Sequence, residues 1–143
     1  MLCCDVLEHV DDPNRVVSEI SRVLRPGGVF CFDTINRTLK SKLVAIKLAQ
    51  DWRPTRLIPR DVHVWHKFVR PNELVEMLER HCMPKCELAG LSLATNPATA
   101  LSALVQKKMG KISFAELGAK LKLVQSNDLS ISYMGYSIRA RHT

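Results

Sequence analysis

The first 32 residues hold the pattern that most restricts the fold of this chain: an apolar strand, a helix and a second apolar strand, joined by short turns. Residues 13–24 are predicted to be helical, because Asp12 can cap the free N–H groups and apolar side chains recur at helical spacing. Residues 25–28, Arg-Pro-Gly-Gly, end that helix, and residues 29–32 are apolar on both faces, as is typical of a buried parallel strand. With residues 1–4 as the first strand, this is a right-handed strand–helix–strand unit. It predicts an α/β fold with a doubly wound sheet.

The rest of the chain continues to mix helical and strand patterns. The predicted elements are a helical segment over 39–48, a helix opening at 71, a strand over 87–93, a helix over 97–108, a helix begun by a capping box of Ser113 and Glu116, and a strand over 129–139. We expect the last strand to be an antiparallel edge strand. Residues 97–125 are predicted to be a helical insertion within a single domain that spans 1–143.

Length and composition fit one globular domain that does not cross a membrane. The 143 residues are 46% hydrophobic, and no apolar run approaches the length of roughly 18 residues that a membrane span needs. The N-terminus lacks the pattern of a secretory signal, so we expect an intracellular protein. The five cysteines are odd in number and irregular in spacing, which predicts free thiols.

The positive charge is concentrated in one segment. Residues 37–70, the basic segment, carry nine basic and two acidic side chains, and 9 − 2 = +7 is the whole net charge of the chain. A solvated basic face and a membrane-surface element are both open interpretations, the second because apolar side chains are interspersed among the lysines and arginines. Nucleic-acid binding is not expected, because no recognisable motif accompanies the charge. The membrane interpretation assigns lipid contact to Lys40, Lys42, Leu43, Lys47, Trp52, Arg53, Arg56 and Arg60. His63 and His66 are expected to be surface residues.

Asp5, Glu8 and His9 form the densest polar cluster, at the carboxyl end of the first strand, where sheets of this kind bind ligands. One turn of helix would place all three side chains on one side. Two carboxylates and an imidazole can hold a divalent cation such as magnesium, and Glu8 or His9 could take a proton from a substrate hydroxyl. By spacing alone, a polar loop with solvated acids and a structural histidine is the favoured alternative.

Several motifs resemble class I S-adenosylmethionine-dependent methyltransferases. The stretches DVLEHV at 5–10, DP at 12–13 and LRPGG at 24–28 are similar to the second half of that fold. A more particular similarity lies in TINRTLKS at 34–41, KFVRPNEL at 67–74, GL at 90–91 and SYM at 132–134. These resemble the ubiquinone-biosynthesis O-methyltransferases, which methylate a catechol-type hydroxyl on a polyprenylated aromatic ring. The resemblance is best over residues 1–93.

The resemblance implies a chemistry and a location. It implies methyl transfer from S-adenosylmethionine to a phenolic oxygen, with Cys4 touching the donor, Glu8 and His9 in catalytic roles, and a metal such as Mg²⁺ at Asp5, Glu8 and His9. Holding the two reactants together would supply much of the rate. The implied partners are a polyprenylated phenol substrate, an anionic membrane surface and other ubiquinone-biosynthesis proteins. The implied location is peripheral on the inner membrane, in a cytoplasmic or mitochondrial setting.

The resemblance begins after the glycine-rich loop and the acidic residue with which class I methyltransferases bind the donor. We therefore expect a partial Rossmann-like methyltransferase domain that lacks the N-terminal donor-binding strands and by itself binds S-adenosylmethionine weakly or not at all. Activity of this chain as an enzyme is thus open. Two other functions are also open: a non-catalytic remnant that binds a membrane or a partner protein through residues 37–70, and another small-molecule methyltransferase that shares only the general motifs.

Overall fold

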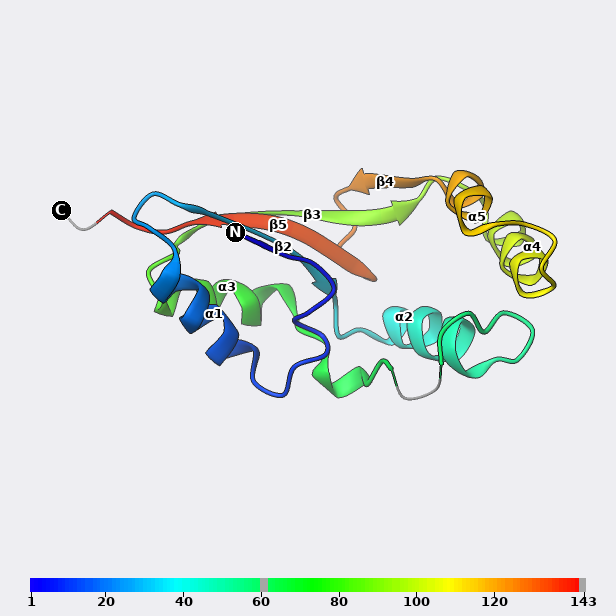
Figure 1. The fold of residues 1–143 in the computed structure, drawn as a ribbon, viewed down its shortest axis with the longest axis horizontal. Coiled ribbons are helices and arrows are strands. Elements are labelled where there is room, and N and C mark those ends of the chain that lie inside the picture. Colours follow the sequence, from blue (N-terminus) through cyan, green and yellow to red (C-terminus); the bar gives the residue numbers. More distant parts are fainter. Residues whose placement is uncertain (60–61, 142–143) are drawn as a thin grey trace.

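The computed structural model describes residues 1–59 and 62–141, which form a five-stranded mixed sheet with helices packed against it (Figure 1). The strands are β1 (Leu2–Cys3), β2 (Val29–Ile35), β3 (Lys85–Leu93), β4 (Leu123–Ser126) and β5 (Ser132–Ile138). The α-helices are α1 (Pro13–Val23), α2 (Leu39–Ser41), α3 (Pro71–Arg80), α4 (Pro97–Lys108) and α5 (Phe114–Leu121). In addition, η1 (Lys42–Asp51) is a π-helix, which is wider than an α-helix, and η2 (Trp65–Lys67) is a 3₁₀-helix, which is tighter. The predicted α/β class is confirmed.

The sheet order is β1-β2-β5-β3-β4, in which β1 and β2 are parallel and the other pairs are antiparallel. The predicted antiparallel direction of β5 is confirmed, but its predicted place at the edge is wrong, because β5 lies between β2 and β3. Gly135 shows how it fits there: its register partners are Phe32 on one side and Leu88 on the other. The glycine leaves room for both neighbouring strands.

Helices α1 and α3 lie on the same face of the sheet and close the hydrophobic core against it (Figure 1). The core residues are Cys3, Leu7, Val17, Ile20, Leu24, Phe30, Phe32, Val69, Leu74, Leu78, Met83 and Tyr133. The predicted start of α1 is confirmed, because the Asp12 side chain accepts a hydrogen bond from Arg15 N at 2.9 Å. The helix ends one residue earlier than predicted, and Leu24 is buried as its C-terminal cap.

The chain between β2 and α3 leaves the sheet, winds through α2 and η1, and returns beside β2. Thr38 begins α2 with a side chain that accepts from Ser41 N at 3.0 Å. The winding then widens, so that Trp52 N donates to Lys47 O, five residues back. The predicted helix over 39–48 is therefore present, but it widens after its first turn and extends to Asp51. Val69 N donates to Ile35 O, which brings the segment back to the sheet.

Residues 97–125 form a hairpin of α4 and α5 followed by most of β4. The predicted capping box is confirmed, since Ser113 N donates to Glu116 Oε2 at 2.6 Å and Glu116 N donates to Ser113 Oγ at 3.1 Å. The predicted insertion thus contains part of a strand as well as two helices, because β4 pairs with β3. Figure 1 places this hairpin at the same end of the molecule as α2, away from both chain ends. Within 1–59 and 62–141, no helix has the length and apolar character needed to cross a membrane.

Candidate functional site

The loop after β1 does not form the helical turn that would align its polar residues. Asp5 adopts a left-handed backbone conformation with φ of 52°, and its N–H donates to Asp33 Oδ1 at 2.8 Å. A tight turn follows, in which His9 N donates to Val6 O at 3.0 Å. As a result Asp5 and His9 are exposed, while Glu8 points inward and is 1% exposed.

Glu8 is a buried carboxyl group with one partner. Its Oε2 accepts a hydrogen bond from Thr34 Oγ1 at 2.9 Å, whereas its Oε1 is buried without a partner in the part of the chain that the structure describes. Burial raises the pKa of Glu8, and the hydrogen bond from Thr34 opposes this only in part. Glu8 therefore favours the neutral form more than an ordinary glutamate does.

The structure does not bring Asp5, Glu8 and His9 together as metal ligands. Among the described residues, no group of three His, Cys, Asp or Glu side chains is placed to hold a metal ion. The physical reason is the inward turn of Glu8 toward Thr34, which separates its carboxylate from the two exposed side chains. The donor set does not fit a cation in this arrangement, so no chemical step below passes through one.

Replacing Glu8 by glutamine is expected to remove one pH-dependent contribution to stability. Because the folded-state pKa of Glu8 is raised, the folded protein binds more protons than the unfolded chain above about pH 4.3, the usual value for glutamate. The stabilising contribution is thus full below that pH and is lost as pH rises through the folded pKa, by at most about 1.4 kcal/mol per pH unit. Urea unfolding between about pH 4 and 8 should show this loss in the wild type and not in Glu8→Gln.

The exposed pair of Glu19 and Arg22 offers a matched control for that measurement. Glu19→Gln changes the same chemical group at the surface and should leave the pH profile close to that of the wild type. Parallel profiles for Glu8→Gln and the wild type would contradict the assignment of a raised pKa to Glu8.

His9 meets a residue that the sequence pattern assigned to the surface. The His9 and His63 rings stack with their centroids 5.3 Å apart, and His63 also contacts Phe68 edge-on at 6.0 Å. Burial, and then the charge of His9, lower the pKa of His63. The expectation of a surface position is confirmed for His66 and wrong for His63, which is half-buried; its backbone N–H donates to Gln50 Oε1 at 2.8 Å. Only the pairing of distant loops brings the two histidines together, and no local pattern signals it.

Cys4 is exposed directly after β1, at the carboxyl end of the sheet. A hydrogen bond with the Asp33 carboxylate raises the pKa of the Cys4 thiol to about 11. The thiol is therefore neutral at physiological pH and is no nucleophile. An exposed neutral side chain at this edge is compatible with contact to a methyl donor, and that contact stays a prediction.

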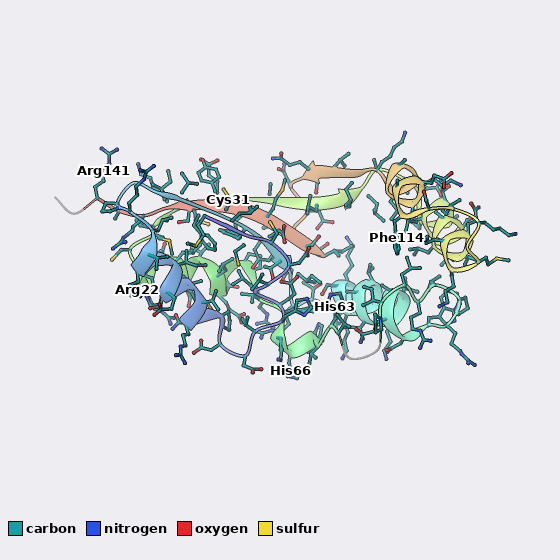
Figure 2. The ribbon with its side chains drawn as sticks, in the orientation of Figure 1. Arg22, Cys31, His63, His66, Phe114 and Arg141 are labelled. Carbon is teal, nitrogen blue, oxygen red and sulfur yellow. The ribbon has the colours of Figure 1, made fainter. Side chains whose placement is uncertain are left out.

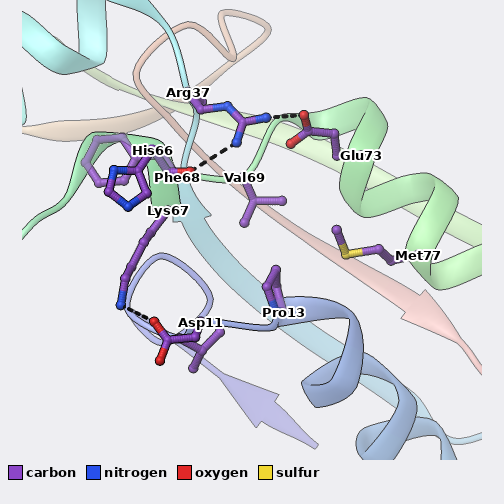
Figure 3. A pocket seen from close by; sticks show the side chains of 10 residues that line it. Asp11, Pro13, Arg37, His66, Lys67, Phe68, Val69, Glu73 and Met77 are labelled. Carbon is purple, nitrogen blue, oxygen red and sulfur yellow. Dashed lines mark hydrogen bonds and ion pairs between the residues drawn. The ribbon is translucent and has the colours of Figure 1, made fainter.

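A cavity of about 430 Å³ lies beside this loop and is framed by two ion pairs (Figure 3). Lys67 Nζ lies 2.6 Å from Asp11 Oδ1 and donates to His9 O at 3.3 Å. Across the cavity, Arg37 pairs with Glu73 and donates to His66 O at 3.1 Å. The apolar part of the lining comes from Val10, Pro13, Phe68, Val69 and Met77. The cavity thus combines an apolar lining with two cations, each held by a carboxylate.

The residues assigned to lipid contact fall into two groups. Lys42, Leu43, Trp52 and Arg53 are exposed, and Leu39 beside them is exposed as well. Lys40 and Lys47 are also exposed but form ion pairs, with Asp128 and Asp51, and Arg56 is half-buried. Arg60 lies outside the described residues.

Comparison with known proteins shows similarity to methyltransferases. Residues 1–32 match the family model described as "Methyltransferase domain". The ubiquinone biosynthesis O-methyltransferase of Aliivibrio fischeri is 38% identical over 97 residues, which are 68% of this chain and 40% of that protein. The protein of the same name from Hahella chejuensis is 40% identical over 90 residues, 63% of this chain and 37% of that protein. This chain therefore spans about 40% of the length of these relatives.

A solved structure shares the fold. A SAM-dependent methyltransferase from Thermotoga maritima superposes with a TM-score of 0.56 and 12% identity, over 96% of this chain and 54% of its own. At that identity the likeness concerns the fold alone. The mixed sheet of this chain thus corresponds to part of a larger methyltransferase fold, as the sequence motifs predicted.

Proposed function

We propose that this chain provides the part of an O-methyltransferase that binds the methyl acceptor. The premise is that the chain is a class I S-adenosylmethionine-dependent methyltransferase in sequence and fold. The proposed acceptor is a phenolic hydroxyl of a polyprenylated aromatic ubiquinone precursor. The family implies S-adenosylmethionine as the methyl donor. The choice of acceptor follows the names of the relatives from Aliivibrio fischeri and Hahella chejuensis and the motifs at 34–41 and 67–74.

One observation carries this proposal. The two motifs that resemble ubiquinone-biosynthesis enzymes are distant in sequence, yet both line the same cavity (Figure 3). Arg37 comes from the first motif, and Lys67 and Glu73 come from the second. The ion pair between Arg37 and Glu73 joins the two motifs directly. Residues that share a cavity can bind the same ligand, which gives the resemblance a physical site.

The cavity suits a phenolic ring. Its volume lies within the range of about 300–1,000 Å³ that small-molecule sites occupy. Phe68, Val69 and Met77 offer an apolar wall to the ring, and Arg37 and Lys67, which pair with Glu73 and Asp11, are N–H donors that can hydrogen-bond a phenolic oxygen. His9 is the proposed base that takes the phenolic proton: its backbone carbonyl accepts from Lys67 of the cavity, and its exposed ring stacks with His63.

The exposed part of the basic segment supports a peripheral membrane location in the same proposal. Leu39, Leu43 and Trp52 are solvent-exposed apolar side chains, and Lys42 and Arg53 lie among them. Apolar side chains among cations are the pattern of a surface that binds an anionic bilayer. Such a surface would bring the cavity close to a polyprenylated acceptor, which partitions into lipid. Contact with other ubiquinone-biosynthesis proteins belongs to the same proposal.

A chimera tests the methyl transfer. In it, the matched part of this chain replaces the corresponding 97 residues of the Aliivibrio fischeri relative. With S-adenosylmethionine and a short-tailed prenylated catechol, mass spectrometry should detect a product that has gained one methyl group. Lys67→Met in the chimera should lower kcat/KM on the order of 100-fold, because a cation beside the developing phenolate is lost.

Arg80→Met is the control, since Arg80 is exposed on α3, pairs with Glu76 and does not line the cavity. It should leave kcat/KM unchanged. A folded chimera that binds S-adenosylmethionine but transfers no methyl group to the catechol would contradict the proposed acceptor and favour a non-catalytic role.

A further inference from the structure

We infer that the hairpin of α4 and α5 is a second surface that binds an anionic lipid bilayer, with Met109, Phe114 and Leu123 as its inserted side chains. The inference rests on the proposed peripheral membrane location, and it goes beyond the basic segment to a region with a different place in the sequence. Residues 97–125 lie outside the segment to which the sequence pattern assigned lipid contact.

The hairpin exposes its largest apolar side chains and buries smaller ones. Ala100 and Ala103 of α4 and Leu117 of α5 are buried. The side chains of Met109, Phe114 and Leu123 are instead 62%, 67% and 66% exposed. A helical pair that packs through alanines while its phenylalanine faces solvent has an unpartnered apolar surface.

The charge around those side chains fits an anionic partner. Residues 97–125 contain five lysines and one glutamate, a net charge of 5 − 1 = +4. Lys107 Nζ lies 4.0 Å from the centre of the Phe114 ring, so cation and aromatic ring are presented together. Lysines beside exposed apolar side chains match the headgroups and the acyl boundary of an anionic membrane. Aliphatic side chains such as Met109 and Leu123 have no comparable use on a nucleic acid, where stacking requires rings.

The distribution of charge over the molecule orients both surfaces the same way. The whole chain has a net charge of +7. Residues 37–70 have a net charge of +7 and residues 97–125 have a net charge of +4, so the net charge of all other residues is 7 − 7 − 4 = −4. The hairpin and α2 at the start of the basic segment lie at one end (Figure 1), and Figure 2 shows Phe114 at the end opposite Arg22 and Arg141. An anionic bilayer would attract this end.

Hydrogen bonds join the start of the basic segment to the loop that follows β4. Lys40 Nζ donates to Asp128 Oδ2 at 2.8 Å and to Ser130 Oγ at 2.7 Å, in the loop that follows β4. Thr38 Oγ1 donates to Ser130 O at 2.6 Å. Because the start of the basic segment is tied to the loop beyond the hairpin, the two surfaces can engage one bilayer together, and each raises the effective concentration of the other.

Vesicle binding by the full chain tests the inference. The double variant Met109→Ser and Phe114→Ser keeps every charge, so it removes insertion without changing electrostatic attraction. Sedimentation with vesicles of phosphatidylglycerol and phosphatidylcholine should show a loss of affinity of on the order of tenfold or more. The control is Val23→Ser, because Val23 is 53% exposed at the opposite end, and it should bind as the wild type does.

A direct depth measurement excludes an indirect effect of the double variant. Phe114→Trp is placed in a Trp52→Phe background, and brominated lipids are used to quench its fluorescence. Stronger quenching than in Trp52→Phe alone supports insertion of residue 114. The inference would be overturned by equal quenching in Phe114→Trp/Trp52→Phe and Trp52→Phe, or by an unchanged vesicle affinity of the Met109→Ser/Phe114→Ser variant. It would also be overturned if that double variant lost affinity for RNA and kept its affinity for vesicles. Methyl transfer by the chimera to a water-soluble catechol is measured without vesicles, so failure of the proposed function is distinguished from failure of this one.

Discussion

Gly135→Ala is expected to destabilise the protein by about 3 kcal/mol. Gly135 lies in β5, between β2 and β3, and a Cβ atom there would stand 2.3 Å from the backbone carbonyl oxygen of Glu87 and 3.0 Å from Phe32 Cζ. A backbone carbonyl within a paired strand cannot move aside without breaking the pairing of β3 with β5. Since a domain of this size is stable by only about 5–15 kcal/mol, the loss should be large in urea unfolding followed by circular dichroism.

Gly118→Ala is the matched control for that substitution. Gly118 lies in α5, and a Cβ there would meet no atom within 4 Å. Alanine should therefore stabilise the protein by about 0.5–1 kcal/mol, because it restricts the unfolded chain and favours helix. If both substitutions shifted the urea midpoint in the same direction, the placement of β5 inside the sheet would be contradicted.

Elements with strong local signals could be predicted from the sequence. Asp12 and Pro13 mark the start of α1, and Ser113 with Glu116 marks the start of α5, because caps and helix-compatible prolines act on the nearest few backbone groups. The order of strands depends instead on contacts between distant segments. Nothing near β5 shows that it will pair with both β2 and β3, so an alternating strand at the end of a chain was expected at the edge.

The candidate site shows the same division between local and distant causes. The position of the loop after β1 was predictable, but the inward turn of Glu8 depends on the hydroxyl of Thr34, 26 residues away. The contact of His9 with His63 depends on how the basic segment returns to the sheet. The charge of the hairpin was hidden by the neutral sum outside residues 37–70, in which +4 and −4 cancel. Only the fold shows that Phe114 of the hairpin lies at the end of the molecule opposite Arg22 and Arg141 (Figure 2).

Replacing Lys42, Arg53 and Arg56 by serine is expected to weaken binding to anionic vesicles on the order of 100-fold at low salt. Each basic side chain near such a surface contributes about 1 kcal/mol, so three contribute about 3 kcal/mol. Lys42 and Arg53 are exposed and Arg56 is half-buried, and Lys40 and Lys47 are kept because they pair with Asp128 and Asp51. Because Lys42 Nζ also lies 4.7 Å from the centre of the Trp65 ring, circular dichroism of the variant should first show that it is folded. Sedimentation with vesicles of increasing phosphatidylglycerol content measures the change.

A second triple variant separates local attraction from net charge. Replacing Arg22, Arg25 and Lys85 by serine also lowers the net charge from +7 to 7 − 3 = +4, but none of the three belongs to residues 37–70 or 97–125, and Figure 2 shows Arg22 at the end opposite Phe114. If the basic end faces the bilayer, the control should bind within a few-fold of the wild type, since the Debye length is about 10 Å at 0.1 M salt. Equal losses in the two variants would mean that net charge alone governs binding and that the molecule has no preferred membrane face. A loss confined to the first variant, and reduced by added salt, would assign the attraction to the basic segment and orient the cavity toward lipid.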